Sequence, residues 1–561
     1  MKKPFSRCLV VLACLLTASG AAIANPPQPT SDYAELARLF TDWRGFVRPP
    51  VKNHVPDYRP AAIAAWQAAL PSWRQRLQDL HTAGWSLEQQ NDGRLVPTEI
   101  NGMDFELRVL RPWARDPAFY VSVRAERSDV PRREGPTVYP QIELYTYRFP
   151  LGVKDQAELA ARLGAIPALL QQARDNLKDS NARDLWVHSV RELREQAATL
   201  ASLQAGALNV MTLEGIQHAD VRAGSAALRK AVEGARTATL QFADWLEAQA
   251  PSKTGPSGVG KDEYNWYQRN VHFSTLDWNG EVELLQRELD RAWSSLKLEE
   301  HANRALPQLQ PAADAAQFDE LARTHLDKFV NFLVGSHVIP AKDYIKVALE
   351  PQRGTFVPEE RRVFFTRITH REPMLLMSHQ YHWLDLARMR DEPHPSPLRR
   401  DASLFNIWDQ RAEGFATAFE EIVMHAGLYA DNPRARELVW IMLANRAARG
   451  LASLHVQANE WTLDQAGQFH ARYTPRGWAA SRDQLTAFEQ LLYLRQPGYG
   501  TSYILGKVQF DQLLARFAQQ AEAAGRPFVL SEFFDRFNGA GMVPIAIIQS
   551  EITANAGSAG P

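Results

Sequence analysis

The chain of 561 residues carries 63 basic and 64 acidic residues, and its formal charge is −1 with neutral histidines. This balance, without any basic stripe, argues against nucleic acid as a partner. Fifteen tryptophans and a hydrophobic content of 45% supply enough apolar mass for a large core, which excludes an intrinsically disordered chain.

Residues 1–24 have the pattern of a secretory signal peptide. A basic start over 2–7 precedes an apolar run over 8–18, and Ala22-Ile23-Ala24 supplies the small-x-small pattern that signal peptidase cleaves. We therefore expect cleavage between Ala24 and Asn25, and export to the periplasm or the medium. The apolar run is shorter than the roughly 20 residues that a membrane-spanning helix needs, and no later run reaches that length.

Both cysteines, Cys8 and Cys14, lie inside this leader. The mature chain therefore has no thiol for a disulfide, a metal ligand or a nucleophile. A lipoprotein anchor at Cys14 is an alternative interpretation of the leader. It is less favoured, because it leaves an apolar core of only six residues before the cysteine.

Helical periodicity dominates the rest of the chain. The segment 155–178 repeats apolar residues along one stripe, and Pro167 is expected to begin a new helix or to kink this one. The segment 191–208 is rich in Ala, Leu, Glu and Gln, and 226–250 is similar. Apolar residues three and four apart predict further helices over 317–334, 411–429 and 434–456.

Strand signals are few. Alternation of apolar and polar residues predicts a strand over 362–368, and 141–147 is a second candidate. We therefore expect a mainly α fold with many helices and a few short strands.

The clearest break in the pattern is the Pro- and Gly-rich stretch 251–262. It divides an N-terminal helical region, 25–250, from a C-terminal helical region, 263–552, that carries the candidate site. The stretch is either a hinge or a buried loop. Residues 553–561 are expected to form a flexible tail.

Residues 255–261 match most of a phosphate-binding loop, G-x-x-x-x-G-K. That loop needs Ser or Thr after the lysine, to hold magnesium, and a strand before it. Here Asp262 follows the lysine, and the preceding segment is predicted to be helical. A carboxylate at this position repels phosphates, so the sequence argues against nucleotide binding.

Two histidines, His379 and His382, lie three residues apart in an aromatic-rich segment. On one helix, residues at i and i+3 share a face, so both imidazoles would reach one metal ion. The zinc-peptidase motif H-E-x-x-H differs, because its histidines are four apart and its glutamate deprotonates water. Gln380 stands where that glutamate is expected and cannot take up a proton. Most histidine pairs of this spacing are hydrogen-bonded core residues.

The predicted helix 411–429 carries Glu413 and Glu420, seven residues apart and therefore on one face. Glu413 follows the second histidine by 31 residues and is placed to complete a shell of two histidines and one glutamate. It is alternatively a buried partner of Arg446 or Arg449. No G-x-S-x-G elbow supports Ser-His-Asp chemistry.

Several blocks in a fixed order carry a family resemblance. They are Leu-Arg-Pro-Trp-Ala-Arg-Asp-Pro over 110–117, Glu-Gly-Phe-Ala-Thr-Ala-Phe-Glu over 413–420, Ala-Gly-Leu-Tyr over 426–429, Arg-Ala-Ala-Arg over 446–449, Glu-Trp-Thr-Leu over 460–463, and Gln-Pro-Gly-Tyr-Gly-Thr-Ser-Tyr over 496–503. The chain resembles the bacterial domain-of-unknown-function family 885, strongly over 370–550 and more faintly back to about residue 100. Members of that family look like helical zinc peptidases of the carboxypeptidase kind.

The resemblance implies a large multi-helix, zinc-peptidase-like fold and an exported protein that acts on a peptide or a small-molecule substrate. Zinc would be held by His379, His382 and Glu413. Glu413 would be a metal or catalytic carboxylate, and Tyr503 would donate a hydrogen bond to a developing oxyanion. If the protein is an active enzyme, another acidic group such as Glu420 must serve as the base, which is our own hypothesis and not part of the resemblance.

The family's H-E-x-x-P-G-H-H motif is not intact in this chain. Alignment on the following apolar run places His382 at a later histidine and puts Leu376 and Met377 at the His-Glu pair. Alignment on His379 still leaves Gln380 at the glutamate, and Tyr499 stands where the family often has glutamine.

Two other interpretations therefore stay open beside a peptidase. One is a catalytically inactive pseudoenzyme that binds peptides or a partner protein in the same cleft, and a site without any cofactor is the alternative to zinc. The other is a structural cell-envelope protein without a ligand.

Overall fold

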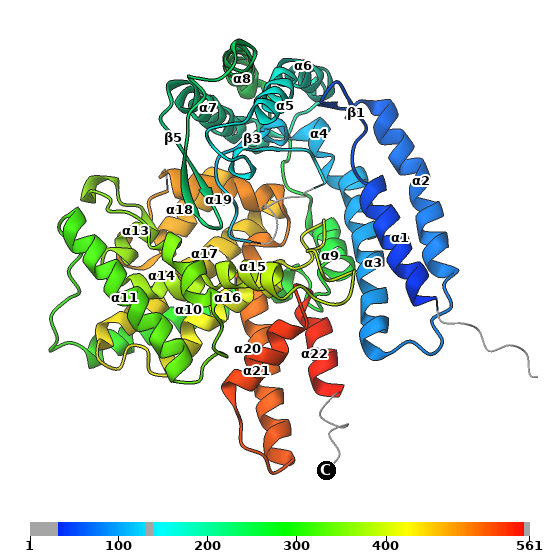
Figure 1. Ribbon diagram of the computed structural model, residues 1–561. Coiled ribbons are helices and arrows are strands. Elements are labelled where there is room, and N and C mark those ends of the chain that lie inside the picture. Colours follow the sequence, from blue (N-terminus) through cyan, green and yellow to red (C-terminus); the bar gives the residue numbers. More distant parts are fainter. Residues whose placement is uncertain (1–31, 131–137, 482, 555–561) are drawn as a thin grey trace, which may run out of the picture.

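The computed structural model describes residues 32–130, 138–481 and 483–554. The predicted signal peptide, its cleavage site and the Cys14 alternative lie outside the described residues, as do residues 555–561. The expectation of a mainly helical fold with a few short strands is confirmed (Figure 1). None of the helices in the described ranges combines the length and apolar character needed to cross a bilayer.

Three long helices form one side of the molecule (Figure 1). They are α1 (Tyr33–Phe46), α2 (Pro60–Gln78) and α3 (Leu87–Phe105). Ser86 caps α3, and its side chain accepts a hydrogen bond from the backbone N–H of Gln89. A π-helical turn (Glu106–Leu110) continues α3 and leads into the short helix α4 (Pro112–Arg115) and a 3₁₀ turn (Pro117–Tyr120).

A second group of helices lies above them in Figure 1. It comprises α5 (Val153–Gly164), α6 (Ile166–Leu177), α7 (Arg183–Ala205) and α8 (Ala226–Gln249). The predicted stripe over 155–178 is confirmed, because Leu159, Leu163, Leu169 and Leu170 are all buried. Pro167 stands in the first turn of α6, where its missing N–H costs no helical hydrogen bond.

The remaining helices form the larger part of the fold. They are α9 (Lys261–Asn270), α10 (Trp278–Ala302), α11 (Ala315–Gly335), α12 (Tyr344–Leu349), α13 (Phe364–Thr369), α14 (Pro373–His379), α15 (Tyr381–Asp391), α16 (Asp409–His425), α17 (Pro433–Gln457), α18 (Leu463–Tyr473), α19 (Gln484–Arg495), α20 (Tyr499–Ala523), α21 (Leu530–Gly539) and α22 (Ile545–Ala554). Single 3₁₀ turns lie at Leu144–Thr146, Ala250–Ser252, Glu350–Gln352, Glu359–Arg361 and Pro475–Gly477. The helices predicted over 317–334, 411–429 and 434–456 correspond to α11, α16 and α17.

The described strands form three two-stranded pairs. β1 (Val51–Lys52) pairs with β2 (Val55–Pro56), β3 (Val123–Arg124) lies parallel to β4 (Ile142–Glu143), and β5 (Leu208–Thr212) forms an antiparallel hairpin with β6 (Gly215–Ala219). Of the strand predicted over 141–147, only β4 forms. The hairpin follows α7, which ends at Gly206 in the left-handed conformation.

The strand predicted over 362–368 is wrong, because this segment forms α13. Its two buried residues, Phe364 and Ile368, lie four positions apart, which is the spacing of one helical face. In a run of only seven residues, a helix and a strand give similar patterns of apolar residues. The local sequence therefore did not distinguish a helix from a strand here.

Two hydrophobic clusters make up most of the core, and α3 contributes to both. Val96, Ile100 and Met103 belong to a cluster that extends over α1 to α8, whereas Leu95 and Phe105 belong to a cluster built mainly from α9 to α22. Helix α17 runs through the second cluster and is buried over nearly its whole length. The candidate site therefore rests on helices that are packed on several sides.

Helices α16 and α20 approach each other closely beside Glu413. A Cβ added to Gly414 would lie 2.2 Å from the Cα of Gly506, and one added to Gly506 would lie 2.0 Å from the carbonyl oxygen of Gln410. Only glycine fits at either position, so this pair of glycines sets how near the two helices lie.

The Pro- and Gly-rich connection is packed against the end of α17. The backbone N–H of Gly258 donates to the side chain of Asn459 at 2.8 Å, and that of Gly260 donates to the carbonyl of Gln457 at 2.8 Å. Because these amides already have partners, they cannot cradle a phosphate, which agrees with the argument against nucleotide binding.

Candidate metal centre

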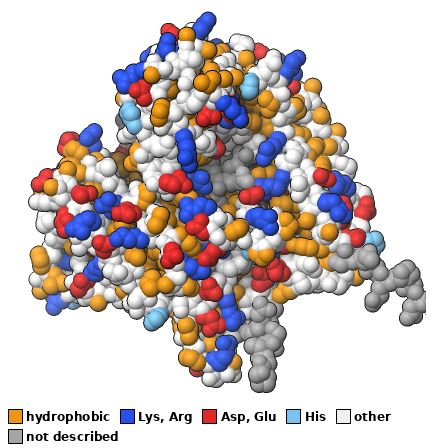
Figure 2. Space-filling model, in the orientation of Figure 1, with side chains coloured by type: hydrophobic (Ala, Val, Ile, Leu, Met, Phe, Trp, Pro, Cys, Tyr) orange, Lys and Arg blue, Asp and Glu red, His pale blue; other side chains and the backbone are white. Residues whose placement is uncertain are grey.

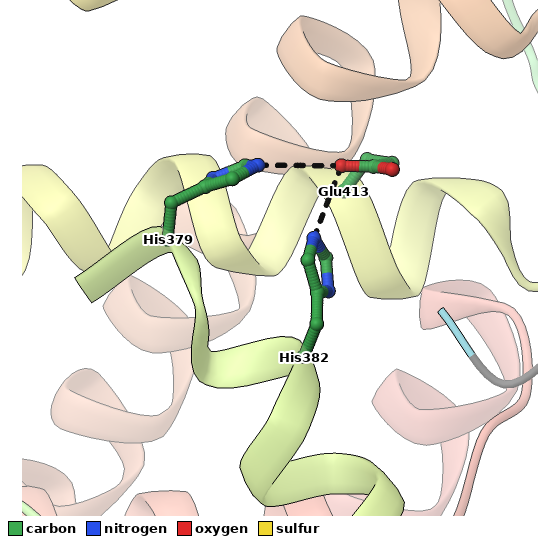
Figure 3. Close-up of side chains that lie close together, drawn as sticks. All are labelled: His379, His382 and Glu413. Carbon is green, nitrogen blue, oxygen red and sulfur yellow. Dashed lines mark hydrogen bonds and ion pairs between the residues drawn. The ribbon is translucent and has the colours of Figure 1, made fainter. Parts of the chain in front are cut away.

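The structure brings His379, His382 and Glu413 together (Figure 3). One ligand atom from each residue lies within 4.8 Å of the other two. The Oε2 atom of Glu413 is 3.2 Å from Nε2 of His382 and 3.5 Å from Nε2 of His379. The two imidazoles therefore point at the same carboxylate oxygen.

The expectation that both histidines lie on one helix is wrong. His379 is the last residue of α14, and His382 is the second residue of α15. The backbone turns at Gln380 (φ −66°, ψ 12°), so the two imidazole rings meet at 81° with their centroids 5.0 Å apart. The side chain of Gln380 donates to the carbonyl of Gln352 at 3.1 Å.

Glu413 uses both of its carboxylate oxygens. Oε2 faces the histidines, and Oε1 accepts a hydrogen bond from the hydroxyl of Tyr499 on α20. Sequence reasoning noted Tyr499 only as a departure from the family pattern and missed this contact. The sequence carries little information about this hydrogen bond, because Tyr499 and Glu413 lie 86 positions apart.

Glu420 lies beside the second ring nitrogen of His379. Its Oε1 atom is 3.3 Å from Nδ1 of His379, and its carboxylate pairs with both terminal nitrogens of Arg446. Burial raises the pKa of Glu420, but Arg446 and His379 outweigh this effect and hold the pKa below its usual value. The contact suits a carboxylate that orients a metal-binding imidazole through its second nitrogen.

Tyr503 lies beside the cluster, next to His379. Its ring is nearly parallel to that of His379, at 19° with centroids 6.2 Å apart. The guanidinium of Arg449 lies over the other side of the ring, 4.2 Å from its centroid. Arg449 itself pairs with Glu489, so neither arginine suggested from the sequence pairs with Glu413.

A buried ion pair joins the helices that carry the ligands. Arg411 on α16 donates to both oxygens of Asp385 on α15, at 2.9 and 3.0 Å, and also to Asn538 at 3.1 Å. Asp385 follows His382 by three residues, and Arg411 precedes Glu413 by two. This bidentate pair therefore restricts the position of one ligand helix relative to the other.

The three side chains of the cluster are almost fully buried. The exposed fractions of the side chains are 13% for His379, 2% for His382 and 4% for Glu413. Burial lowers the pKa of His382, but the Glu413 carboxylate raises it more strongly, and the result is a pKa of about 9. Burial likewise raises the pKa of Glu413, and the two imidazoles bring it well below its ordinary value. A metal ion binding here competes with protons.

The donor set fits a divalent zinc ion. Bonds of about 2.0–2.1 Å in tetrahedral geometry separate neighbouring ligand atoms by about 3.3 Å. The two histidine-to-glutamate distances, 3.2 and 3.5 Å, bracket this value. Two imidazoles and one carboxylate are also ligands that zinc accepts readily.

Two solved structures share the fold of this chain. One is a candidate lipoprotein of unknown function from Shewanella oneidensis, with a TM-score of 0.65 and 13% identity, over 93% of this chain and 100% of the other. The second is a candidate lipoprotein from Colwellia psychrerythraea, with a TM-score of 0.64 and 14% identity, over 94% of this chain and 100% of the other. No curated protein matches the sequence.

A family model matches residues 42–330 and 382–552, which include His382, Glu413, Tyr499 and Tyr503. His379 lies just outside the matched ranges. Because the match covers most of the chain, the protein belongs to the bacterial family of proteins of unknown function DUF885.

Proposed function

We propose that this protein is an exported zinc-dependent hydrolase that cleaves peptides. The convergence of two imidazoles on one carboxylate oxygen, at 3.2 and 3.5 Å, supports this proposal most strongly. His379, His382 and Glu413 are the proposed ligands. The predicted leader, and the fold shared with two candidate lipoproteins, support export.

The number of ligands favours a catalytic site over a structural one. Among the described residues, the cluster contains three His, Cys, Asp or Glu side chains. Structural zinc sites have four protein ligands, whereas catalytic sites have three and leave one position for water or substrate. Zinc bound in this way lowers the pKa of water and polarises a carbonyl group.

The surrounding side chains have separate roles in this proposal. Tyr499 and Glu420 orient the ligands Glu413 and His379 through the contacts described above. His379 retains the largest exposure of the three ligands, at 13%. Tyr503, whose ring lies next to His379, donates its hydroxyl to the oxygen that becomes negative in the transition state.

The site lacks the glutamate that serves as general base in the usual zinc-peptidase motif. Gln380 is an amide that donates to the carbonyl of Gln352 and cannot serve as a base, whereas Glu420 is a carboxylate paired with Arg446. Asp129 is half-buried, and its charge helps to raise the pKa of His382. Glu420, which contacts His379, therefore stays the first candidate for the proton acceptor, and Asp129 is the second.

A pseudoenzyme is the second candidate function. The side chain of Gln380, at the position of the usual glutamate, favours it, because no carboxylate occupies that position. In this alternative the same residues bind a peptide or a partner protein without cleaving it.

Zinc content and turnover distinguish these alternatives. Mature protein purified without chelators should contain about one zinc per chain, and the double change His382→Ala, Glu413→Ala should abolish binding. His425→Ala is the matched control, because His425 is 61% exposed at the end of α16. Protein that stays metal-free when supplied with zinc contradicts the proposed site.

A peptide library incubated with zinc-loaded protein tests cleavage. Turnover by the zinc-loaded wild-type protein supports the hydrolase. If turnover disappears in Asp129→Asn while the zinc content is retained, Asp129 is the base, and if turnover persists, Glu420 remains the candidate. Binding of peptides without cleavage in the wild-type protein supports the pseudoenzyme.

A further inference from the structure

A cavity of about 470 Å³ lies between the N-terminal helices and the segment that joins α19 to α20. The strands β3 and β4 contribute to its wall. Figure 2 shows that this face of the molecule is hollowed below α7 and α8, with basic side chains around the hollow. Five arginines line the cavity, and they come from separate parts of the chain: Arg48, Arg115, Arg124, Arg127 and Arg495.

The carboxylates in the same wall do not balance these arginines. Asp116 pairs with Arg495 at 2.6 Å, so the charges of this aspartate and this arginine cancel. Burial raises the pKa of Glu106 to about 8, so this carboxyl is mostly protonated and uncharged at neutral pH. Glu143 is the other acidic side chain of the wall. The cavity therefore has an excess of positive charge.

The side chains of two of the arginines have no partner among the residues that the structure describes. Within the described ranges, no carboxylate lies at ion-pair distance from Arg48 or Arg127 in the structure. The Nε atom of Arg127 is also fully buried and lacks a hydrogen-bond acceptor. An anion in the cavity would pair with the guanidinium groups of Arg48 and Arg127, both of which line it.

Two residues of the cavity wall connect it to the segments that carry the candidate metal centre. Val130 lines the cavity and belongs to the same hydrophobic cluster as Ala412, the residue before Glu413. Gln496 also lines the cavity, three residues before Tyr499, whose hydroxyl contacts Glu413. The segment 127–130 thus connects Arg127 to Asp129, whose charge acts on His382.

We propose that this cavity is a substrate subsite that binds a carboxylate group of the peptide, with Arg127 and Arg48 as its recognition residues. The inference rests on the proposed function, because it takes the bound molecule to be the peptide substrate. Guanidinium groups bind carboxylates through paired, charge-assisted hydrogen bonds, which suits a C-terminal carboxylate and an acidic side chain equally.

Calorimetric titration of the mature full-length protein with three peptides tests the subsite. The probes are acetyl-Ala-Ala-Ala with a free C-terminal carboxylate, its C-terminal amide, and acetyl-Ala-Glu-Ala amide. Each titration is carried out with zinc and again with a chelator, which prevents metal-dependent cleavage. The variants are Arg127→Gln and Arg48→Gln, and the control is Arg269→Gln, an exposed arginine of α9 outside the cavity.

Wild-type protein should bind at least one of the two anionic probes about tenfold more tightly than the neutral amide, which corresponds to about 1.4 kcal/mol. Arg127→Gln should remove this preference, and Arg48→Gln should reduce it severalfold. Arg48 is exposed, so its variant is expected to fold even if Arg127→Gln does not. A preference for the first probe identifies the C-terminal carboxylate, and a preference for the third identifies an acidic side chain.

Equal affinity for all three probes overturns the inference, as does full retention of the preference in both variants. These outcomes are distinct from a failure of the proposed function. Zinc-dependent turnover without any preference for a carboxylate contradicts only the subsite. Carboxylate-dependent binding by a protein that binds no zinc contradicts only the hydrolase.

Discussion

The hydroxyl of Tyr499 donates a hydrogen bond to Oε1 of Glu413, across the interface between α20 and α16. The other carboxylate oxygen faces His382 and His379. Because one oxygen is held by the tyrosine, the second is kept in the orientation that a metal ion requires. This contact connects the C-terminal helices directly to the candidate centre.

Tyr499→Phe should weaken zinc binding without unfolding the protein. The change removes only the donor to Glu413, and loss of a hydrogen-bond partner of a metal ligand typically lowers metal affinity by about 10–100-fold. Competition with a fluorescent zinc chelator measures the affinity. Tyr344→Phe, on α12, is the control and should leave it unchanged. Unaltered zinc affinity in Tyr499→Phe means that the hydroxyl does not support a metal site.

Glu420→Gln should destabilise the fold by about 3–5 kcal/mol, because it leaves the charge of Arg446 buried and unpaired. Both side chains of this pair are no more than 2% exposed. Asp431→Asn removes one partner of the exposed pair with Lys328 and should cost only roughly 0–1 kcal/mol. Urea denaturation followed by tryptophan fluorescence compares the two variants. If both variants lose a similar free energy of unfolding, burial does not make the Glu420–Arg446 pair more important than the exposed pair.

Gly506→Ala should separate α16 from α20 and destabilise the protein by about 3 kcal/mol, since the new Cβ would collide with the backbone of Gln410. Zinc affinity should fall as well, because Glu413 lies beside the contact. Gly234→Ala is the opposite case. Gly234 lies inside α8 with no atom near its added Cβ, so alanine should stabilise the protein by roughly 0.5–1 kcal/mol. Thermal melting should show a lower melting temperature for Gly506→Ala and a higher one for Gly234→Ala than for the wild type.

Glu281→Gln should make the protein more stable than the wild type at alkaline pH. Burial raises the pKa of Glu281 to about 8, an effect that the hydrogen bond from Tyr264 only partly offsets. The raised pKa means that the folded state keeps its proton where the unfolded state has lost it. The stability that this proton contributes is complete below about pH 4.5 and is lost as the pH rises towards 8.

The stability difference between Glu281→Gln and the wild type should therefore grow between pH 5 and 8, by up to about 1.4 kcal/mol per pH unit, and then level off. Glu283→Gln, on the exposed face of the same helix, is the control and should show no such trend. Denaturation midpoints at several pH values provide the measurement. A constant difference across this range argues that Glu281 is ionised in the fold.

The helices were largely predictable because their signal is local. In α5 and α6, Leu159, Leu163, Leu169 and Leu170 follow the helical period and are buried as expected. The predicted strand over 362–368 failed because a short apolar run fits two periods, and only its packing as α13 separates them. The residues of the candidate centre were also identifiable, since their types and spacing point to a metal.

The sequence by itself determined the helical class of this protein, the family blocks, and the choice of His379, His382 and Glu413 as candidates. Only the tertiary structure decided that the two histidines belong to different helices, that Tyr499 holds Glu413, and that Arg446 neutralises Glu420. The physical reason is the distance along the sequence over which each kind of interaction acts. Helical periodicity acts over a few residues, whereas these contacts join positions from 26 to 86 residues apart, where the packing of whole helices selects the partners.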